Sequence, residues 1–207
     1  LKHHHRHYHP NIQRWMLFVD GENFTIRAQD IAKEKGLELI QGDYYEPDVY
    51  VWPSLMLQVE IIIDGLLKKA PIRSYYYTSV VGDDNRVNEI KNRLWRIGFH
   101  PEVFKKIKGR KSKGVDITLT KDVLSHAFLN NYDLAVLLAG DADYLPLINE
   151  IKRIGKLVYL VFHEDAIVDE NLIRAADLYE GISIHRFELS NQKGILKKDK
   201  LPSKKKI

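Results

Sequence analysis

The sequence predicts an α/β fold of three layers (α/β/α), with a central, mainly parallel sheet of five to six strands between two layers of helices. Two observations predict it. Short apolar runs without helical periodicity alternate along the chain with segments in which apolar residues recur at helical spacing. The runs also lack alternating polar residues, as is typical of strands buried on both faces of a parallel sheet. Strands that alternate with helices are joined by right-handed crossovers, which place helices over both faces.

Six apolar runs are predicted to be strands. The first ends at Asp20 and the fourth at Gly140, and a helical pattern follows each of them. The third run contains more polar residues, so we expect it at an edge of the sheet. In chain order the predicted strands are residues 15–20, 72–78, 102–107, 134–138, 157–162 and 182–185.

Helices are predicted between the strands from apolar residues at helical spacing. Gly21 lets the chain turn into the first helix, Gly98 and Gly155 end two others, and Pro146 lies in a first turn, where proline is tolerated. The predicted helices begin near residue 22 and at Pro53, and then cover residues 87–97, 115–129, 146–154 and 171–178.

Residues 36–71 are predicted to be an insert, consisting of an irregular loop followed by the helix that starts at Pro53. The aromatic-rich part of the loop, residues 44–52, is a candidate self-contact surface of a homodimer.

The composition is that of one globular domain with charged ends. A chain of 207 residues, 44% of them hydrophobic, is long enough to bury a single core. The absence of cysteine excludes disulfides, thiolate metal sites and a thiol nucleophile. No apolar run approaches the roughly 18 residues of a membrane span, and no early stretch resembles a secretory signal. We therefore expect a cytoplasmic protein with no membrane segment.

The formal net charge of +4 resides in the ends of the chain. Residues 191–207 hold seven lysines and one aspartate, and residues 1–10 hold two further cations, so the middle is mildly acidic. Attraction for a polyanion must then come from local patches. Residues 1–13 resemble a histidine-rich tag, and the lysine-rich tail at 190–207 has nothing to bury, which leaves residues 14–189 as the expected domain.

Aspartates are predicted to gather at one edge of the sheet. In the doubly wound strand order 3-2-1-4-5, the first and fourth strands are neighbours where the order reverses, and such folds bind ligands at that point. This order brings together Asp20, Asp116, Asp141 and Asp143. Carboxylates this close take up protons or hold a cation, and a site made only of oxygen atoms favours Mg²⁺ or Mn²⁺. His163 lies near this edge without a histidine partner, and we expect it to be structural.

A simpler interpretation makes Asp141 or Asp143 the cap of the following helix. A cap needs one carboxylate, however, and it does not explain why Asp20 and Asp116 are expected at the same edge. The metal site is therefore the favoured interpretation.

Three short motifs lie on these elements in order: DGEN at residues 20–23, KGVD at 113–116 and GDADY at 140–144. Together they resemble the NYN domain family, in the LabA-like branch of the PIN-like nuclease superfamily. The resemblance implies a Rossmann-like fold and a metal-dependent endoribonuclease that hydrolyses RNA. It further implies that Asp20, Asp116, Asp141 and Asp143 form the metal site, and that Asn23 positions water or the phosphate.

Two alternatives stay open. Ala139 stands where relatives often carry a hydroxyl residue, which keeps an inactive RNA-binding or regulatory module with the same acidic pocket as the second interpretation. A phosphatase or receiver domain would use an aspartyl nucleophile and a lysine after a later strand. Lys156 begins the fifth predicted strand rather than ending it, which counts against that third interpretation.

Contacts with RNA are predicted from charge and aromaticity. The basic loop at residues 105–113 leads into Asp116, so its cations would flank the crevice, although a charge run is often only a hydrated connection. Its candidate phosphate contacts are Lys108, Arg110, Lys111 and Lys113. Tyr75, Tyr76 and Tyr77 alternate across a strand, so at least one is core. Tyr77, nearest the carboxyl end, is a candidate for stacking on a base.

Overall fold

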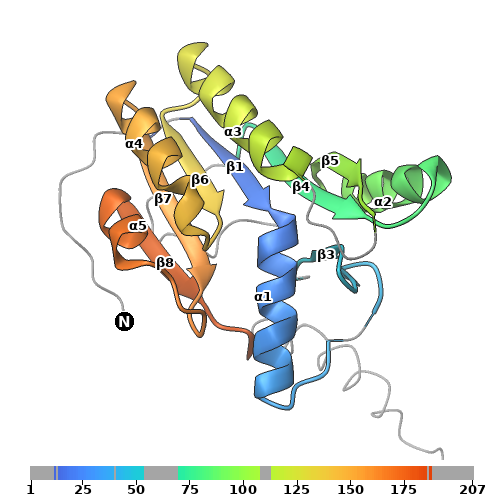
Figure 1. Cartoon of the computed structure of the whole chain (residues 1–207). Coiled ribbons are helices and arrows are strands. Elements are labelled where there is room, and N and C mark those ends of the chain that lie inside the picture. Colours follow the sequence, from blue (N-terminus) through green and yellow to red (C-terminus); the bar gives the residue numbers. More distant parts are fainter. Residues whose placement is uncertain are drawn as a thin grey trace, which may run out of the picture.

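A six-stranded parallel sheet with the order β5-β4-β1-β6-β7-β8 lies at the centre of the structure (Figure 1). The structure is a computed structural model that describes residues 12, 14–39, 41–53, 70–107, 113–185 and 187. The order matches the predicted doubly wound arrangement, with the sixth strand added at one edge. The strands are β1 (Trp15–Asp20), β4 (Ser74–Val80), β5 (His100–Lys105), β6 (Leu134–Leu138), β7 (Leu157–His163) and β8 (Leu178–Ile182).

Helices cover both faces of this sheet, as predicted. One face packs against α1 (Gly21–Glu34) and α2 (Asp84–Arg96). The other packs against α3 (Lys113–Phe128), α4 (Leu145–Arg153) and α5 (Glu170–Ala175). Gly98 and Gly155 follow α2 and α4 with φ of 99° and 84°, which only glycine adopts without strain. The chain is therefore a three-layer α/β/α fold.

Alternation along β1 decides which residues face which layer. Trp15, Leu17 and Val19 belong to the core under α1 and α2, whereas Met16 and Phe18 belong to the core under α3 and α4. Successive strand residues point to opposite faces, so Asp20, the last residue of β1, continues the even-numbered set. The carboxylate of Asp20 is thus directed to the layer that contains α3 and α4.

The last strand and helix differ from the prediction. β8 comprises Leu178–Ile182 rather than 182–185, and α5 is confined to Glu170–Ala175. Residues 178–181 are only partly buried, because β8 is an edge strand that pairs with β7 alone. A strand that is partly exposed lacks the continuous apolar run on which the prediction depended.

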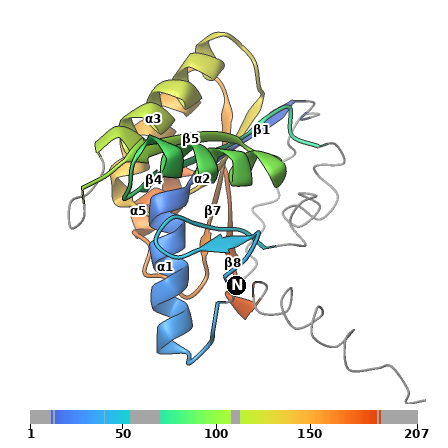
Figure 2. The same ribbon diagram turned by 90° about the vertical axis from the view of Figure 1, so that its right-hand side faces the viewer.

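Residues 41–53 form a small hairpin where an irregular loop was predicted. β2 (Tyr45–Glu46) pairs antiparallel with β3 (Tyr50–Val51), and the hairpin lies beside α1 (Figure 2). Tyr50 and Trp52 are buried in the core of the same chain. These two rings are therefore used internally, whereas Tyr44 and Tyr45 are partly exposed, and the self-contact through this segment stays a prediction. The helix predicted to begin at Pro53 falls in residues 54–69, outside the described part of the chain.

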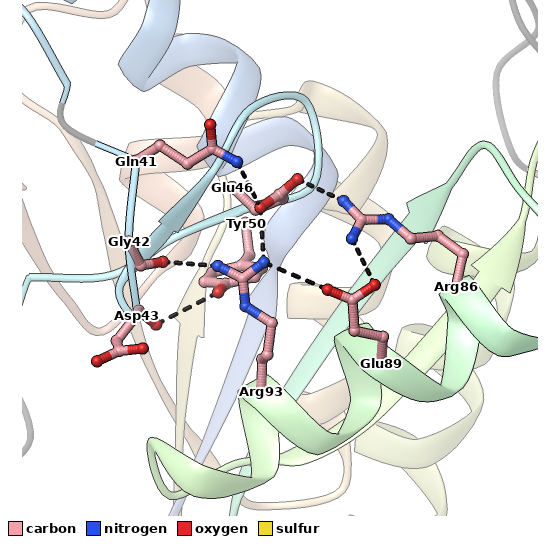
Figure 3. Close-up of polar contacts among 8 residues, drawn as sticks. All are labelled: Gln41, Gly42, Asp43, Glu46, Tyr50, Arg86, Glu89 and Arg93. Carbon is pink, nitrogen blue, oxygen red and sulfur yellow. Dashed lines mark hydrogen bonds and ion pairs between the residues drawn. The ribbon is translucent and has the colours of Figure 1, made fainter.

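An ion-pair network attaches the hairpin to α2 (Figure 3). The carboxylate of Glu46 accepts hydrogen bonds from Arg86, from Arg93 at 2.7 Å and from Gln41 at 3.0 Å, and Arg93 also donates to the Gly42 carbonyl. Burial raises the pKa of Glu46, but the hydrogen bonds from Arg93, Gln41 and Arg86 outweigh it, and the pKa lies below its ordinary value. Glu46 is therefore ionised and joins the hairpin segment to α2.

Replacement of Glu46 by alanine is expected to lower the free energy of unfolding by about 2 kcal/mol, because two partly buried guanidinium groups lose their shared acceptor. Chemical denaturation at pH 7 measures this. The control is Glu170→Ala, which breaks an exposed pair with Arg174 and should cost less than about 0.5 kcal/mol. Equal losses in the two variants would contradict a stabilising role for the network.

Candidate active site

Asp20 occupies the point where the chain order of the strands reverses. It ends β1 between β4 and β6, and its relative exposure is only 3%. Its Oδ1 atom accepts a hydrogen bond from the backbone N–H of Asn23 at 3.0 Å, so the same carboxylate caps α1. The second oxygen, Oδ2, accepts from the hydroxyl of Tyr144 at 2.9 Å.

Tyr144 joins Asp20 to Asp116. Its hydroxyl lies 2.9 Å from Asp20 Oδ2 and 3.3 Å from Asp116 Oδ1, and a phenol has one proton to share between them. Asp116 lies in the first turn of α3 and is exposed. The structure therefore brings together two of the predicted site residues from distant segments. Sequence reasoning missed Tyr144, and its place in the GDADY motif was the signal that pointed to it.

Burial dominates the electrostatics of this group. The pKa of Asp20 is raised to about 7, chiefly by desolvation; the charges of Asp116 and Glu22 add to the rise, and the hydrogen bonds from Asn23 and Tyr144 oppose it. Desolvation also raises the pKa of Tyr144, as do the two neighbouring carboxylates, so its hydroxyl keeps its proton and donates. Such an acidic pair is costly to ionise unless a cation or a proton compensates.

Replacement of Tyr144 by phenylalanine is expected to lower the free energy of unfolding by about 2 kcal/mol at pH 8 without metal, and by less at pH 5. The reason is that the hydroxyl bonds an ionised Asp20 only at the higher pH. Denaturation in EDTA at both pH values measures the difference. Tyr132→Phe is the control, because the Tyr132 hydroxyl donates to the neutral Val123 carbonyl and its loss should not depend on pH. A pH-independent loss for Tyr144→Phe would contradict the assignment.

Asp141, Asp143 and Asn23 lie at the same edge of the sheet. Asp141 accepts a hydrogen bond from the Asp143 backbone N–H at 3.1 Å and caps the 3₁₀ helix η2 (Ala142–Tyr144), while Asp143 is exposed. A Cβ atom added to Gly140 would lie 3.7 Å from Asn23 Oδ1, so the first and third motifs are adjacent. Asp141 thus has the capping role of the simpler interpretation, which leaves its second oxygen available for other contacts.

The donor set fits a hard divalent cation with few protein ligands. Within the described residues, no group of three or more histidine or acidic side chains is close enough to hold a metal ion. Asp20 and Asp116 nevertheless converge on one hydroxyl and offer only oxygen atoms. Mg²⁺ is usually bound by one or two carboxylates, with water and substrate phosphate completing its coordination. The pair therefore suits Mg²⁺ or Mn²⁺ better than zinc, which recruits histidine or cysteine.

The candidate RNA contacts fall into two groups: basic residues whose side chains are not described, and Tyr77, which is buried. Lys108, Arg110 and Lys111 lie outside the described residues, and of Lys113 only the backbone, at the start of α3, is described. Tyr77 has no exposed surface, and its hydroxyl donates to Asp122 at 3.1 Å. A ring buried under α3 cannot stack on a base, so the prediction for Tyr77 is wrong. The face of the strand, rather than nearness to its end, decides exposure.

His163 and Lys156 make structural contacts with residues outside the acidic group. His163 is buried, its Nε2–H donates to the Phe24 carbonyl at 2.9 Å, and its ring stacks on that of Phe24. Burial lowers the pKa of His163 to about 4, so the imidazole is neutral. Lys156 directly precedes β7, and its ammonium contacts the Asn130 side chain at the amino edge of the sheet, far from Asp20. This position does not fit the lysine of a phosphatase or receiver domain.

Comparison with known protein families assigns the chain to one of them. A sequence profile of the NYN domain matches residues 14–183. The chain belongs to the NYN domain family. NYN domains are typically nucleases of the PIN-like superfamily, they bind RNA as a family trait, and they generally use divalent metals. The three motifs at the carboxyl edge of the sheet lie within the matched residues.

The fold of this NYN domain also resembles a solved structure. A crystal structure of a protein of unknown function from Vibrio parahaemolyticus RIMD 2210633 superimposes with a TM-score of 0.60 and 18% sequence identity, covering 86% of this chain and 97% of that one. A likeness at this identity supports the fold alone. A comparison with functionally curated proteins gave no match. Among the described helices, none has the length and apolarity needed to span a bilayer.

Proposed function

We propose that this NYN domain is a metal-dependent endoribonuclease that hydrolyses RNA phosphodiester bonds. The observation that carries the proposal is the single Tyr144 hydroxyl shared by Asp20 and Asp116 at the reversal point of the sheet. The hydroxyl has only one proton to donate to the two carboxylates. When both carboxylates are ionised they repel each other, and a bound cation would offset this repulsion. Placement in the LabA-like branch and in the cytoplasm belongs to the same proposal and rests on the motifs and the composition.

The proposed roles follow from burial. Asp20 is held rigidly by its cap contact and by Tyr144, and Asp116 is exposed and accessible to substrate. These two would hold Mg²⁺ or Mn²⁺, with Asp141 and Asp143 as further ligands directly or through water. When bound, the cation polarises the phosphoryl oxygen and neutralises charge on the leaving oxygen.

Asn23 is the proposed positioning residue for water or phosphate. Its side-chain oxygen lies beside Gly140, between the first and third motifs, and its backbone N–H is already used by Asp20. An amide group can both donate and accept, so it can orient a polar ligand beside the carboxylates without adding charge. No side-chain nucleophile is required for hydrolysis by this route.

Incubation of the purified protein with labelled single-stranded RNA, with Mn²⁺ or with EDTA, tests the proposal. We expect cleavage only with Mn²⁺, and a loss of at least about 100-fold in Asp116→Asn, because Asp116 is exposed and its replacement leaves the core intact. Asp30→Asn, which removes an exposed aspartate from the middle of α1, should cleave at the wild-type rate. Cleavage by Asp116→Asn at the wild-type rate would reject the site.

A second candidate is an RNA-binding or regulatory module without turnover. Ala139 favours it, because this residue is buried at the end of β6 and brings no hydroxyl to the crevice. The same experiment separates the two functions. Binding of the RNA without any Mn²⁺-dependent cleavage above that of Asp116→Asn would select the module.

A further inference from the structure

A nearly buried ion pair lies beside the acidic group. The ammonium of Lys106 is 3.3 Å from Glu22 Oε1, and both side chains are 15% exposed. The other oxygen of Glu22 accepts a hydrogen bond from the Ser79 hydroxyl at 3.0 Å. Glu22 lies in the first turn of α1, two residues after Asp20. The pair therefore connects the end of β5 to the helix that Asp20 caps.

Lys106 is fixed at both its backbone and its side chain. Its backbone N–H donates to the Val80 carbonyl at 3.0 Å, which extends the pairing of β5 with β4 beyond the last strand residue. Its side chain is held by Glu22, and Ser79 in turn orients Glu22. A lysine held in this way presents its charge at a defined place, unlike a lysine in a hydrated loop.

The place is the carboxyl edge of the sheet, near Asp20 and Asp116. Glu22 follows Asp20 by two residues in the first turn of α1, and its charge contributes to the raised pKa of Asp20. On the other side, a Cβ atom added to Gly114 would lie 2.9 Å from the ring of Phe104, so the start of α3 packs on the end of β5. Lys106 follows Phe104 by two residues, and Asp116 follows Gly114 by two residues. Both residues thus lie at the same edge.

A contribution to stability does not by itself explain why a lysine and a glutamate are paired at this position. Removing a lysine and a glutamate from water costs several kcal/mol, and an apolar pair of similar size often stabilises a fold as well or better. A phosphodiester, in contrast, must approach the carboxylates of Asp20 and Asp116 against repulsion. A neighbouring ammonium with three N–H donors, one of which Glu22 takes, offsets that repulsion.

We propose that Lys106, held by Glu22, contacts a backbone phosphate of the RNA that lies in the crevice. The inference deepens the proposed function, on which it depends only for RNA as the ligand. Glu22 is then a positioning residue, because it acts through Lys106 rather than on the substrate.

The test measures binding of a fluorescein-labelled oligouridine of about 12 nucleotides, a length that falls within the site sizes of single-strand binders, in EDTA over a range of NaCl concentrations. Each phosphate contact on a single strand contributes about 0.7 to the slope of log K against log[salt]. We expect Lys106→Met to reduce the slope by about 0.7 and to weaken binding about fivefold at low salt. Lys106→Arg should retain the wild-type slope.

The matched control is Lys152→Met. Lys152 also pairs with one aspartate, Asp177, but it lies at the end of α4 and the amino edge of the sheet. Its loss should leave the slope unchanged. An unchanged slope in Lys106→Met, or no binding of the oligonucleotide by the wild type, would overturn the proposal.

Two further comparisons keep the result interpretable. If Lys106→Met alone fails to fold because Glu22 is left unpaired, the double variant Lys106→Met/Glu22→Gln is compared with Glu22→Gln, and the same slope difference is expected. Because binding is measured in EDTA, the result does not depend on cleavage. A reduced slope together with no Mn²⁺-dependent cleavage would retain the role of Lys106 and reject the nuclease.

Discussion

Replacement of Asp20 by asparagine is expected to raise the stability of the metal-free protein at pH 8 and to abolish Mn²⁺-dependent RNA cleavage. Asparagine keeps the contacts of the native residue. Its side-chain oxygen can accept from the Asn23 N–H, and asparagine is a good helix cap. Its amide can donate to the Tyr144 oxygen, which leaves the Tyr144 hydroxyl for Asp116. The variant therefore removes one buried charge and little else.

The raised pKa of Asp20 determines the direction of the expected change in stability. The pKa of Asp20 is about 7 in the folded protein and near its ordinary value of 3.8 in the unfolded chain, and burial is the main cause. Between about pH 4 and pH 7 the folded protein therefore holds a proton that the unfolded chain has released, so stability falls as the pH rises through this window. The full penalty is present above pH 7, and it is up to about 4 kcal/mol. Asparagine does not titrate, so the Asp20→Asn variant does not incur this loss of stability.

Thermal denaturation in EDTA at pH 5 and pH 8 measures the effect. The wild type should melt at a lower temperature at pH 8 than Asp20→Asn, and the difference should shrink at pH 5. Added Mn²⁺ should raise the melting temperature of the wild type but not that of the variant. A variant that melts below the wild type at pH 8, or that still cleaves RNA with Mn²⁺, contradicts the role given to Asp20.

Replacement of Gly21 by alanine is expected to lower the free energy of unfolding by about 3 kcal/mol or to prevent folding. A Cβ atom at this position would lie 2.0 Å from Tyr76 Cε1 and 2.7 Å from the Tyr77 carbonyl oxygen. The Tyr76 ring cannot move away, because it is fully buried and its hydroxyl is hydrogen-bonded to the backbone of Val51. The clash must then be relieved by separating α1 from β4.

Chemical denaturation compares this variant with Gly42→Ala. A Cβ atom at Gly42 would meet nothing within 4 Å, and Gly42 has no positive φ, so its replacement should change stability by less than about 1 kcal/mol. If Gly21→Ala were as stable as Gly42→Ala, the close approach of α1 and Tyr76 would be refuted. Activity is expected to fall together with stability, since Gly21 follows Asp20 directly.

The glycine also illustrates where sequence reasoning found the right residue for the wrong reason. We predicted that Gly21 lets the chain turn, yet it is the first residue of α1, and it is not among the described glycines with positive φ. The residue is needed because a ring from β4 occupies the space of its side chain. A motif identifies such a position, but only the packing of a neighbouring strand explains it.

The strands were predictable because the signals for them are local, and their order was taken from the common doubly wound arrangement. Continuous apolar runs indicate strands buried on both faces, and the positions of the aspartates indicate which ends of the strands share an edge. The same reasoning failed for β8, which is partly exposed, and for the hairpin of β2 and β3, whose strands have two residues each. Short or edge strands have too few apolar residues to carry a pattern.

The sequence by itself determined the three-layer fold, the family and the edge at which Asp20 and Asp116 meet. Only the tertiary structure decided that Tyr144 joins these carboxylates and that Glu22 holds Lys106. These contacts link residues between 28 and 124 positions apart, and each depends on how a helix packs on the sheet to within hydrogen-bond distance. Periodicity along the chain fixes which face a residue occupies, whereas packing between elements fixes which atoms touch.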